Sequence, residues 1–204
     1  MTKVLLIRHA QTSWNQSRRV QGGNNDTVLD AEGDRQCRFL TQRLKKEDIK
    51  AVYSSPLSRA MGTAQWIADS HGLEVIAEPA FREMDCGTLE GAEIDDIGSR
   101  LQMLIQGGSE DELLFKGCGG ESCAELQNRA WNAILQKVEA HQDGTIAVVS
   151  HYFVLGAIFC AAVGIPATQL GRFRIGATSV SIVGFDSYGP SLSLFNDRSH
   201  LTVA

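Results

Sequence analysis

The segment KVLLIRH, residues 3–9, joins four consecutive apolar residues to Arg8 and His9. An unbroken apolar run closed by a charge is typical of a strand buried on both faces of a parallel sheet. The segment TIAVVSH, residues 145–151, repeats this pattern and ends in His151. The sequence therefore predicts two buried strands, each of which is followed by a histidine.

Around these two segments the chain alternates short β-rich runs with helical patterns. Further strands are expected at residues 51–54 and 74–78, and a closing hairpin at 179–185 and 191–195. A helix is expected at residues 31–46, with Asp30 as its N-cap. A second helix is expected to begin with Ser55 as N-cap and Pro56 as first residue and to end at residues 71–72. Two more are expected at 126–138 and at 153–163. This alternation predicts an α/β fold with three layers, α/β/α, around a mostly parallel central sheet.

The middle of the chain, about residues 85–120, is rich in glycine and carries one helical stripe. The stripe consists of Ile94, Ile97, Leu101, Leu104 and Ile105. We expect a small helical insertion that covers the end of the sheet in a lid-like manner. No repeat or linker divides the chain, so residues 1–204 are expected to form a single domain.

The composition excludes several classes of protein. With 204 residues, 43% hydrophobic and 21% charged, the chain is neither disordered nor fibrous, and no apolar run reaches the roughly 20 residues of a membrane span. The first apolar run is stopped by Arg8, unlike a signal peptide. Five cysteines without a C-x-x-C pair indicate reduced thiols, and we expect a cytoplasmic protein. The net charge of -5 argues against a nucleic-acid partner, and it requires any anionic substrate to meet a local cluster of positive charge.

Such a cluster is predicted at the carboxyl ends of the strands, where ligands bind in open α/β sheets. The residues that follow successive strands are Arg8, His9, Arg59, Glu83 and His151. Two guanidinium groups bind phosphate through planar forks, and a neutral imidazole can attack phosphorus. A second, protonated imidazole can stabilise the oxygens, while a carboxylic acid can protonate the leaving group and later activate water. Each residue alone is more often structural, so the prediction rests on their joint placement.

The motifs around these residues resemble those of the histidine phosphatase superfamily, in its phosphoglycerate-mutase-like branch. Residues 5–15, LLIRHAQTSWN, are similar to the family's R-H-G-x-T/S-x-x-N signature, and residues 53–64 to its S-S-x-L-x-R-A-x-x-T-A element. Further similar stretches lie at 21–22, 29–36, 83–91, 120–122, 148–151 and 196–201. The resemblance thus covers nearly the whole chain.

The resemblance implies a role for each residue of the strand-end set. His9 is the expected nucleophile, which becomes phosphohistidine, and Glu83 is the expected proton donor. The phosphoryl oxygens are expected to be held by Arg8, Arg59 and His151. No metal ion or nucleotide cofactor is implied.

Further substrate contacts are expected from Asn15, Gln21, Gly22 and Tyr152. Two positions depart from the family pattern, since Ala10 and Tyr152 stand where glycine is usual. A residue with a Cβ at Ala10 would cost about 1 kcal/mol if that position needs a positive φ. Tyr152 could point away, narrow the entrance or stack on a substrate.

The family contains both phosphatases and mutases, and its mutases tend to be longer. The length of 204 residues therefore favours a phosphomonoesterase, with α-ribazole phosphate or a sugar phosphate as candidate substrates. The alternatives are a cofactor-dependent phosphoglycerate mutase and a phospholigand-binding protein without turnover. Partners other than a small phosphorylated metabolite are not indicated, although the strands of residues 179–195 could offer an edge for a homodimer.

Other residues give weaker signals. Cys86, Cys118 and Cys123 lack the spacing and the fourth ligand of a metal site, so loop or buried cysteines are the simpler interpretation. Three arginines, Arg18, Arg19 and Arg82, could meet the leaving group, but a solvated surface position is more common. Trp14 could lie in the core or form a wall on which a substrate stacks, and a core position is the favoured expectation.

Overall fold

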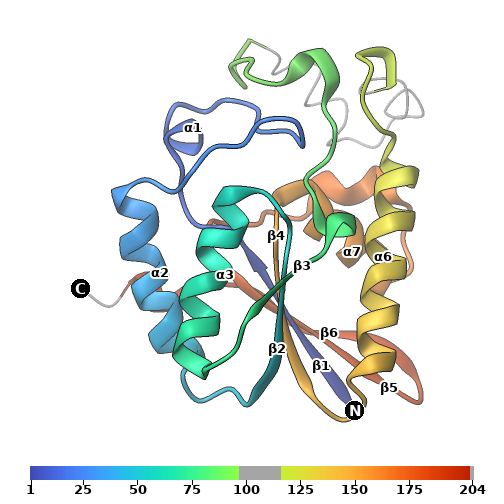
Figure 1. Cartoon of the computed structure of the whole chain (residues 1–204). Helices are drawn as coiled ribbons and strands as arrows, with labels where there is room; N and C mark the ends of the chain where they lie inside the picture. The colour runs from blue at the N-terminus through green and yellow to red at the C-terminus, as the bar shows by residue number, and fades with distance from the viewer. Residues whose placement is uncertain (97–115, 203–204) are drawn as a thin grey trace.

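The computed structural model describes residues 1–96 and 116–202 and is built around one twisted sheet (Figure 1). Six strands have the order β3-β2-β4-β1-β5-β6. Four of them are parallel: β1 (Thr2–Arg8), β2 (Ile49–Ser54), β3 (Val75–Ala77) and β4 (Thr145–Ser150). The hairpin of β5 (Val180–Asp186) and β6 (Gly189–Asp197) adds antiparallel to β1. The predicted, mostly parallel sheet is confirmed.

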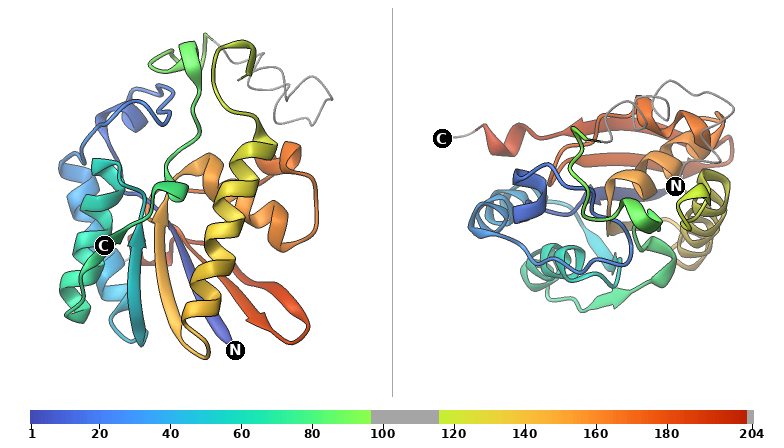
Figure 2. Two further views of the ribbon diagram at one scale, coloured as in Figure 1. Left: turned by 45° about the vertical axis from the view of Figure 1, so that its right-hand side comes forward. Right: turned by 90° about the horizontal axis from the view of Figure 1, so that it is seen from above.

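Helices cover both faces of the sheet (Figures 1 and 2). On one face, α2 (Ala31–Leu44) and α3 (Ser58–His71) pack with Leu5 and Ile7 of β1. On the other, α6 (Cys123–Ala140) and α7 (Tyr152–Ala162) pack with Val4 and Leu6. Since successive side chains of a strand point to opposite faces, an unbroken apolar run is what a sheet covered on both faces requires. The three-layer prediction is therefore confirmed.

The start of α3 differs from the prediction. Ser55 does not cap the helix at Pro56; instead Leu57 occupies the N-cap position and the helix begins at Ser58. The hydroxyl of Ser55 lies 2.7 Å from Nε2 of His151, and it also accepts from the N–H of Leu57 at 3.3 Å. The N–H of Ser58 is bound by the carboxylate of Asp26, which comes from a distant loop.

Several short elements lie where the parallel strands end, toward the top of Figure 1. They include α1 (Ser13–Gln16), a helix that was not predicted and that begins with a capping box formed by Thr12 and Asn15. Two 3₁₀ turns, η1 (Pro79–Phe81) and η2 (Gly87–Leu89), follow β3. A third 3₁₀ helix, η3 (Ala167–Arg172), packs against α7, and a fourth, η4 (Ser199–Leu201), lies beside α2 near the C-terminus. Most of the predicted helical stripe of the insertion lies outside the described residues.

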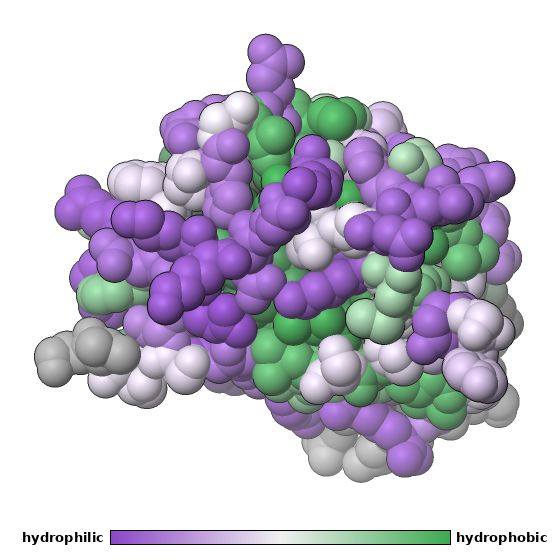
Figure 3. Space-filling view, turned by 90° about the horizontal axis from the view of Figure 1, so that it is seen from below, coloured by the Kyte–Doolittle hydropathy of each residue, from purple (hydrophilic) through white to green (hydrophobic). Residues whose placement is uncertain are grey.

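The opposite end of the sheet has an ordinary surface, with hydrophilic side chains around small hydrophobic areas (Figure 3). Within the described ranges, no helix is long and apolar enough to cross a membrane.

Candidate active site

His9 directly follows β1 and is almost completely buried, with 2% of its surface exposed. Its Nδ1 lies 2.7 Å from the carbonyl oxygen of Ala10. Because a carbonyl oxygen only accepts, Nδ1 carries the proton and Nε2 keeps a lone pair. Burial, together with the charges of Arg59 and Arg8, holds the pKa of His9 well below its usual value. The ring is therefore a neutral imidazole with a free nucleophilic nitrogen.

His151, the N-cap of α7, lies beside it, with a distance of 5.1 Å between the ring centroids. Nε of Arg59 donates to Nδ1 of His151 at 3.3 Å, so Nδ1 accepts and the other nitrogen carries the proton. Burial and then the charge of Arg59 hold the pKa of His151 well below its usual value. His151 is therefore neutral, because burial and the neighbouring charge of Arg59 both disfavour its protonated form. This corrects the expectation of a protonated ring. A phosphoryl dianion nearby would oppose this effect and favour protonation.

Arg59 lies in the first turn of α3, as predicted, and is fully buried. Its two terminal nitrogens donate to backbone carbonyls of one loop, those of Asn25 at 2.8 Å and Gly22 at 3.1 Å. At the N-terminus of α3, the carboxylate of Asp26 accepts from both the N–H and the hydroxyl of Ser58. The helix dipole thus acts on Asp26 and not on a substrate anion.

Arg8, the last residue of β1, has a guanidinium that is only partly used within the described residues. Its Nη1 donates to the carbonyl of Ile175 at 2.7 Å, and the guanidinium carbon lies 5.4 Å from the centre of the Tyr152 ring. Its Nε is buried without a partner among the described residues. An unsatisfied buried N–H is costly, so this group is suited to an anion.

Glu83 is also buried, with 4% of its surface exposed. Its two carboxyl oxygens accept from the backbone N–H groups of Met84 at 2.8 Å and Phe153 at 3.4 Å. Burial raises the pKa of Glu83, although these hydrogen bonds and Arg59 oppose the shift. A carboxyl group with a raised pKa can hold a proton for a leaving group.

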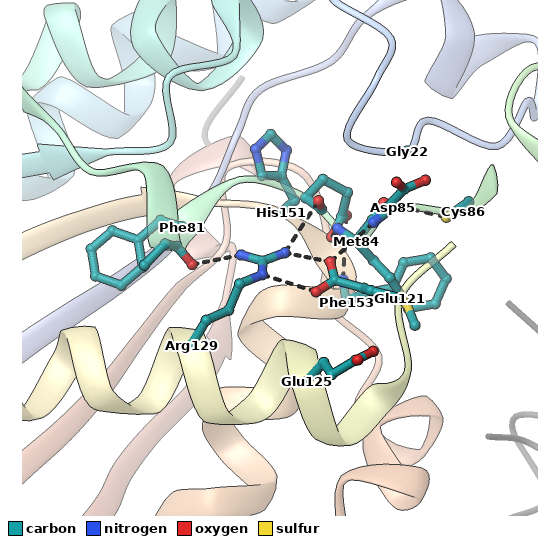
Figure 4. Close-up of polar contacts among 12 residues, drawn as sticks. Gly22, Phe81, Met84, Asp85, Cys86, Glu121, Glu125, Arg129, His151 and Phe153 are labelled. Carbon is teal, nitrogen blue, oxygen red and sulfur yellow. Dashed lines mark hydrogen bonds and ion pairs between the residues drawn. The ribbon is translucent and has the colours of Figure 1, made fainter. Parts of the chain in front are cut away.

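The segment that carries Glu83 is held by an arginine from α6 (Figure 4). The guanidinium of Arg129 donates to the carbonyls of Ala80 at 2.6 Å and Glu83 at 3.3 Å. Glu121 binds the same guanidinium at 2.6 Å and accepts from the N–H of Asp85 at 3.0 Å. Sequence reasoning missed Arg129; the only available signal was the match at residues 120–122, which includes Glu121.

A cavity of ≈ 380 Å³ opens beside these groups. It is lined by six of the predicted site residues: Arg8, His9, Asn15, Gln21, Glu83 and Tyr152. Arg59, His151 and Gly22 do not line it; the first two are completely buried behind the surface. The structure thus brings the predicted residues together, some in the cavity wall and others buried behind it.

The expected substrate-binding residues use their oxygens within the protein. Asn15 accepts from the N–H of Thr12 at 3.0 Å, and Gln21 accepts from the hydroxyl of Thr27 at 2.8 Å. The amide N–H groups are therefore what Asn15 and Gln21 can offer to an anion. Gly22 has a different task, because a Cβ there would lie 2.1 Å from the carboxylate of Glu90. Its carbonyl holds Arg59.

Neither departure from the family pattern strains the backbone. Ala10 and Tyr152 do not have a positive φ, so the cost considered for Ala10 does not arise. Ala10 is fully buried and donates its N–H to the hydroxyl of Thr63 at 3.0 Å. Tyr152 begins α7 and forms part of the cavity wall beneath Arg8.

The outer wall of the cavity contains the remaining candidates. Arg18 and Arg19 line it, while Arg82 is exposed elsewhere. Trp14 is half-buried and also lines the cavity, so the prediction of a core position is wrong. Arg174, which no sequence pattern indicated, lines it too. In the part of the chain that the structure describes, no group of three or more potential ligands is placed to hold a metal ion.

The chain is similar over nearly its whole length to known enzymes. The model of the histidine phosphatase superfamily, branch 1, matches residues 4–198. Phosphoserine phosphatase 1 of Hydrogenobacter thermophilus is 31% identical over 201 residues, which cover 98% of this chain and 95% of that protein. A probable phosphoglycerate mutase of Serratia proteamaculans is 34% identical over 187 residues, covering 90% and 85%. The structure of a phosphoserine phosphatase mutant from Entamoeba histolytica in complex with phosphoserine is 29% identical, with a TM-score of 0.86 and 98% and 100% covered.

Proposed function

Because the chain belongs to the histidine phosphatase superfamily, we propose that it hydrolyses a small phosphorylated metabolite through a phosphohistidine intermediate on His9. The family and its phosphoserine phosphatase relatives support a phosphatase as the general activity. The observation that carries the detailed proposal is the neutral, buried His9, which lines the cavity with its Nδ1 proton bound to Ala10. No metal ion is required for this chemistry.

In the first step Nε2 of His9 attacks phosphorus, and the bond from phosphorus to the ester oxygen breaks. Glu83 gives its proton to the departing oxygen, so the alcohol leaves neutral. The growing positive charge on the imidazole is stabilised by the hydrogen bond from Nδ1 to the carbonyl of Ala10. The product is phosphohistidine and an ionised Glu83.

The second step returns the enzyme to its starting state. Ionised Glu83 takes a proton from water, whose oxygen attacks phosphorus and displaces Nε2 of His9. Arg8 holds the phosphoryl oxygens through the part of its guanidinium that lines the cavity. Arg59 uses three of its five N–H groups within the protein, so it acts mainly through its charge.

A phosphoglycerate mutase is the alternative, and length does not decide against it. A relative named as a probable phosphoglycerate mutase is covered to 85% by this chain, so the two proteins have similar lengths. A length of 204 residues therefore does not favour a phosphatase over a mutase. The choice between hydrolysis and transfer depends on whether water or a second hydroxyl accepts the phosphoryl group.

A substrate panel tests the proposal. The protein is incubated with phosphoserine, 3-phosphoglycerate, α-ribazole phosphate and several sugar phosphates, and free phosphate is measured. We expect phosphate release from at least one ester. If 3-phosphoglycerate were only isomerised, with no phosphate above background, the protein would be a mutase. If no ester reacted and no phosphoenzyme formed, the remaining interpretation would be a phospholigand-binding protein.

A further inference from the structure

Of the three arginines in the outer cavity wall, Arg18, Arg19 and Arg174, only Arg174 is not paired with an acid of the described residues. Arg18 lies 2.8 Å from Asp95 and Arg19 lies 2.9 Å from Glu93, so both of these charges are compensated. Arg174 contacts only neutral acceptors, the carbonyl of Gly171 at 3.0 Å and the hydroxyl of Tyr152 at 3.5 Å. No carboxylate of residues 1–96 or 116–202 forms an ion pair with it. Its positive charge is therefore available to a ligand.

Tyr152 fixes the spacing between this charge and the phosphate end of the cavity. The guanidinium of Arg8 lies over the ring, and that of Arg174 lies at the hydroxyl. The hydroxyl also donates to the carbonyl of Phe173 at 2.9 Å, which holds the ring in place. The side chain of Tyr152 thus lies between the guanidinium groups of Arg8 and Arg174. This spacing suits a compact metabolite that carries two anionic groups.

The rest of the wall favours a simple carbon skeleton. It includes the apolar side chains of Trp14, Ile94, Phe153 and Leu170. These groups suit the carbon atoms of a ligand, and Asn15 and Gln21 provide amide groups in the same wall. One guanidinium balances one negative charge, and its planar fork matches the two oxygens of a carboxylate.

We infer that Arg174 binds a carboxylate on the alcohol part of the substrate, and that the enzyme selects small phosphomonoesters that carry one. This inference rests on the proposed function and narrows its substrate class. Arg8, His9 and Glu83 act on the phosphoryl group, whereas Arg174 recognises the other end of the same molecule.

The test compares esters that differ only in the carboxylate. Phosphoserine is paired with phosphoethanolamine, and 3-phosphoglycerate with glycerol 3-phosphate. The wild-type enzyme should show a kcat/KM about tenfold higher for the carboxylated member of at least one pair, since a charge-assisted hydrogen bond has an effect of that size. Equal kcat/KM values within both pairs would overturn the inference, although the phosphatase proposal would stand.

Variants assign the preference to the residue. Arg174→Gln should lower kcat/KM for the carboxylated ester about tenfold, mainly through KM, and change kcat/KM for the ester without a carboxylate much less. Arg174→Lys should retain part of the preference. Arg172→Gln is the matched control, because Arg172 is exposed two residues away and does not line the cavity. An equal loss with both esters in Arg174→Gln would contradict the inference.

A binding measurement separates this inference from the proposed function. In a His9→Ala background, which cannot turn over, 3-phosphoglycerate and glycerol 3-phosphate are titrated by calorimetry with and without Arg174→Gln. The carboxylated ester should bind about tenfold more tightly, and the difference should disappear in the double variant. If the preference survived Arg174→Gln, the inference would be wrong. This readout decides the question even if no ester is hydrolysed.

Discussion

Nδ1 of His9 donates its proton to the carbonyl oxygen of Ala10 at 2.7 Å. This hydrogen bond selects one tautomer, so the lone pair resides on Nε2 before any substrate arrives. It also orients the ring, because Ala10 is itself fixed by the hydroxyl of Thr63 at 3.0 Å. The backbone next to the histidine thus determines which nitrogen is nucleophilic.

Replacing His9 by Asn separates this orientation from nucleophilic catalysis. The amide of Asn can still donate to Ala10, but it has no nitrogen that can attack phosphorus. We expect His9→Asn to fold and to lose activity by at least about a thousandfold. Rapid quenching with a ³²P-labelled ester should show an acid-labile phosphoenzyme in the wild type only. His71→Asn, a change at the end of α3, is the control; label retained in His9→Asn would refute the mechanism.

The two buried histidines also predict how stability depends on pH. The pKa values of His9 and His151 are held well below 6.5 in the folded state, chiefly by burial. The unfolded chain therefore binds protons first as the pH falls. The contribution of each neutral ring to the free energy of unfolding is fully present above pH 6.5. As the pH falls below 6.5, this contribution decreases by about 1 kcal/mol per pH unit.

Urea denaturation between pH 7.5 and 5.5 measures this loss. Other groups titrate in the same range, so the informative quantity is the difference between wild type and His9→Asn. We expect the free energy of unfolding to fall less steeply for His9→Asn, because one titrating ring is missing. Parallel curves for the two proteins would show that His9 is not a neutral buried group.

Glu83 leads to a prediction about the leaving group. If its raised pKa serves proton donation, its removal should matter most for alcohols that leave poorly. Glu83→Gln should lower kcat about a hundredfold or more for an alkyl phosphate and much less for p-nitrophenyl phosphate. Glu78→Gln, in the same segment but paired with Lys137 away from the cavity, is the control. An equal loss with both esters would assign Glu83 another role.

The strand-end residues could be predicted because their signals are local. The apolar runs before Arg8 and before His151 identify buried strands, and the rule for open sheets then brings Arg59 and Glu83 to the same edge. Patterns of this kind depend only on neighbours in the sequence. They therefore located most of the fold and the residues closest to the cavity.

The supporting contacts could not be predicted in this way, because each joins distant segments. Asp26 caps α3 across 32 positions, and Arg129 reaches Ala80 across 49. An arginine on a helix has the same sequence appearance whether it faces solvent or a backbone carbonyl. Arg174 could not be predicted for the same reason. The prediction of a core position for Trp14 is wrong because the sequence of a loop does not show whether an aromatic side chain faces the core or a cavity.

Arg129 provides a prediction that separates positioning from simple stabilisation. It holds the carbonyls on either side of the turn that presents Glu83, so its loss should displace the proton donor without touching the substrate (Figure 4). Arg129→Met should therefore lower kcat for an alkyl phosphate about tenfold and affect p-nitrophenyl phosphate less, as Glu83→Gln does. Glu121→Gln, which weakens the same contact, should show a smaller effect of the same kind.

The matched control is Lys137→Met, since Lys137 also lies on α6 and pairs at 2.6 Å with Glu78 of the segment before the turn. This change removes a comparable ion pair, but the contact lies farther from Glu83 in the sequence and holds none of its backbone. Both variants could lose stability, so melting curves are recorded beside the kinetics. A difference between the two esters that appears in Arg129→Met and not in Lys137→Met requires a displaced proton donor, because partial unfolding removes active sites equally for every substrate. Equal losses with the two esters in Arg129→Met would show that Arg129 only stabilises the fold.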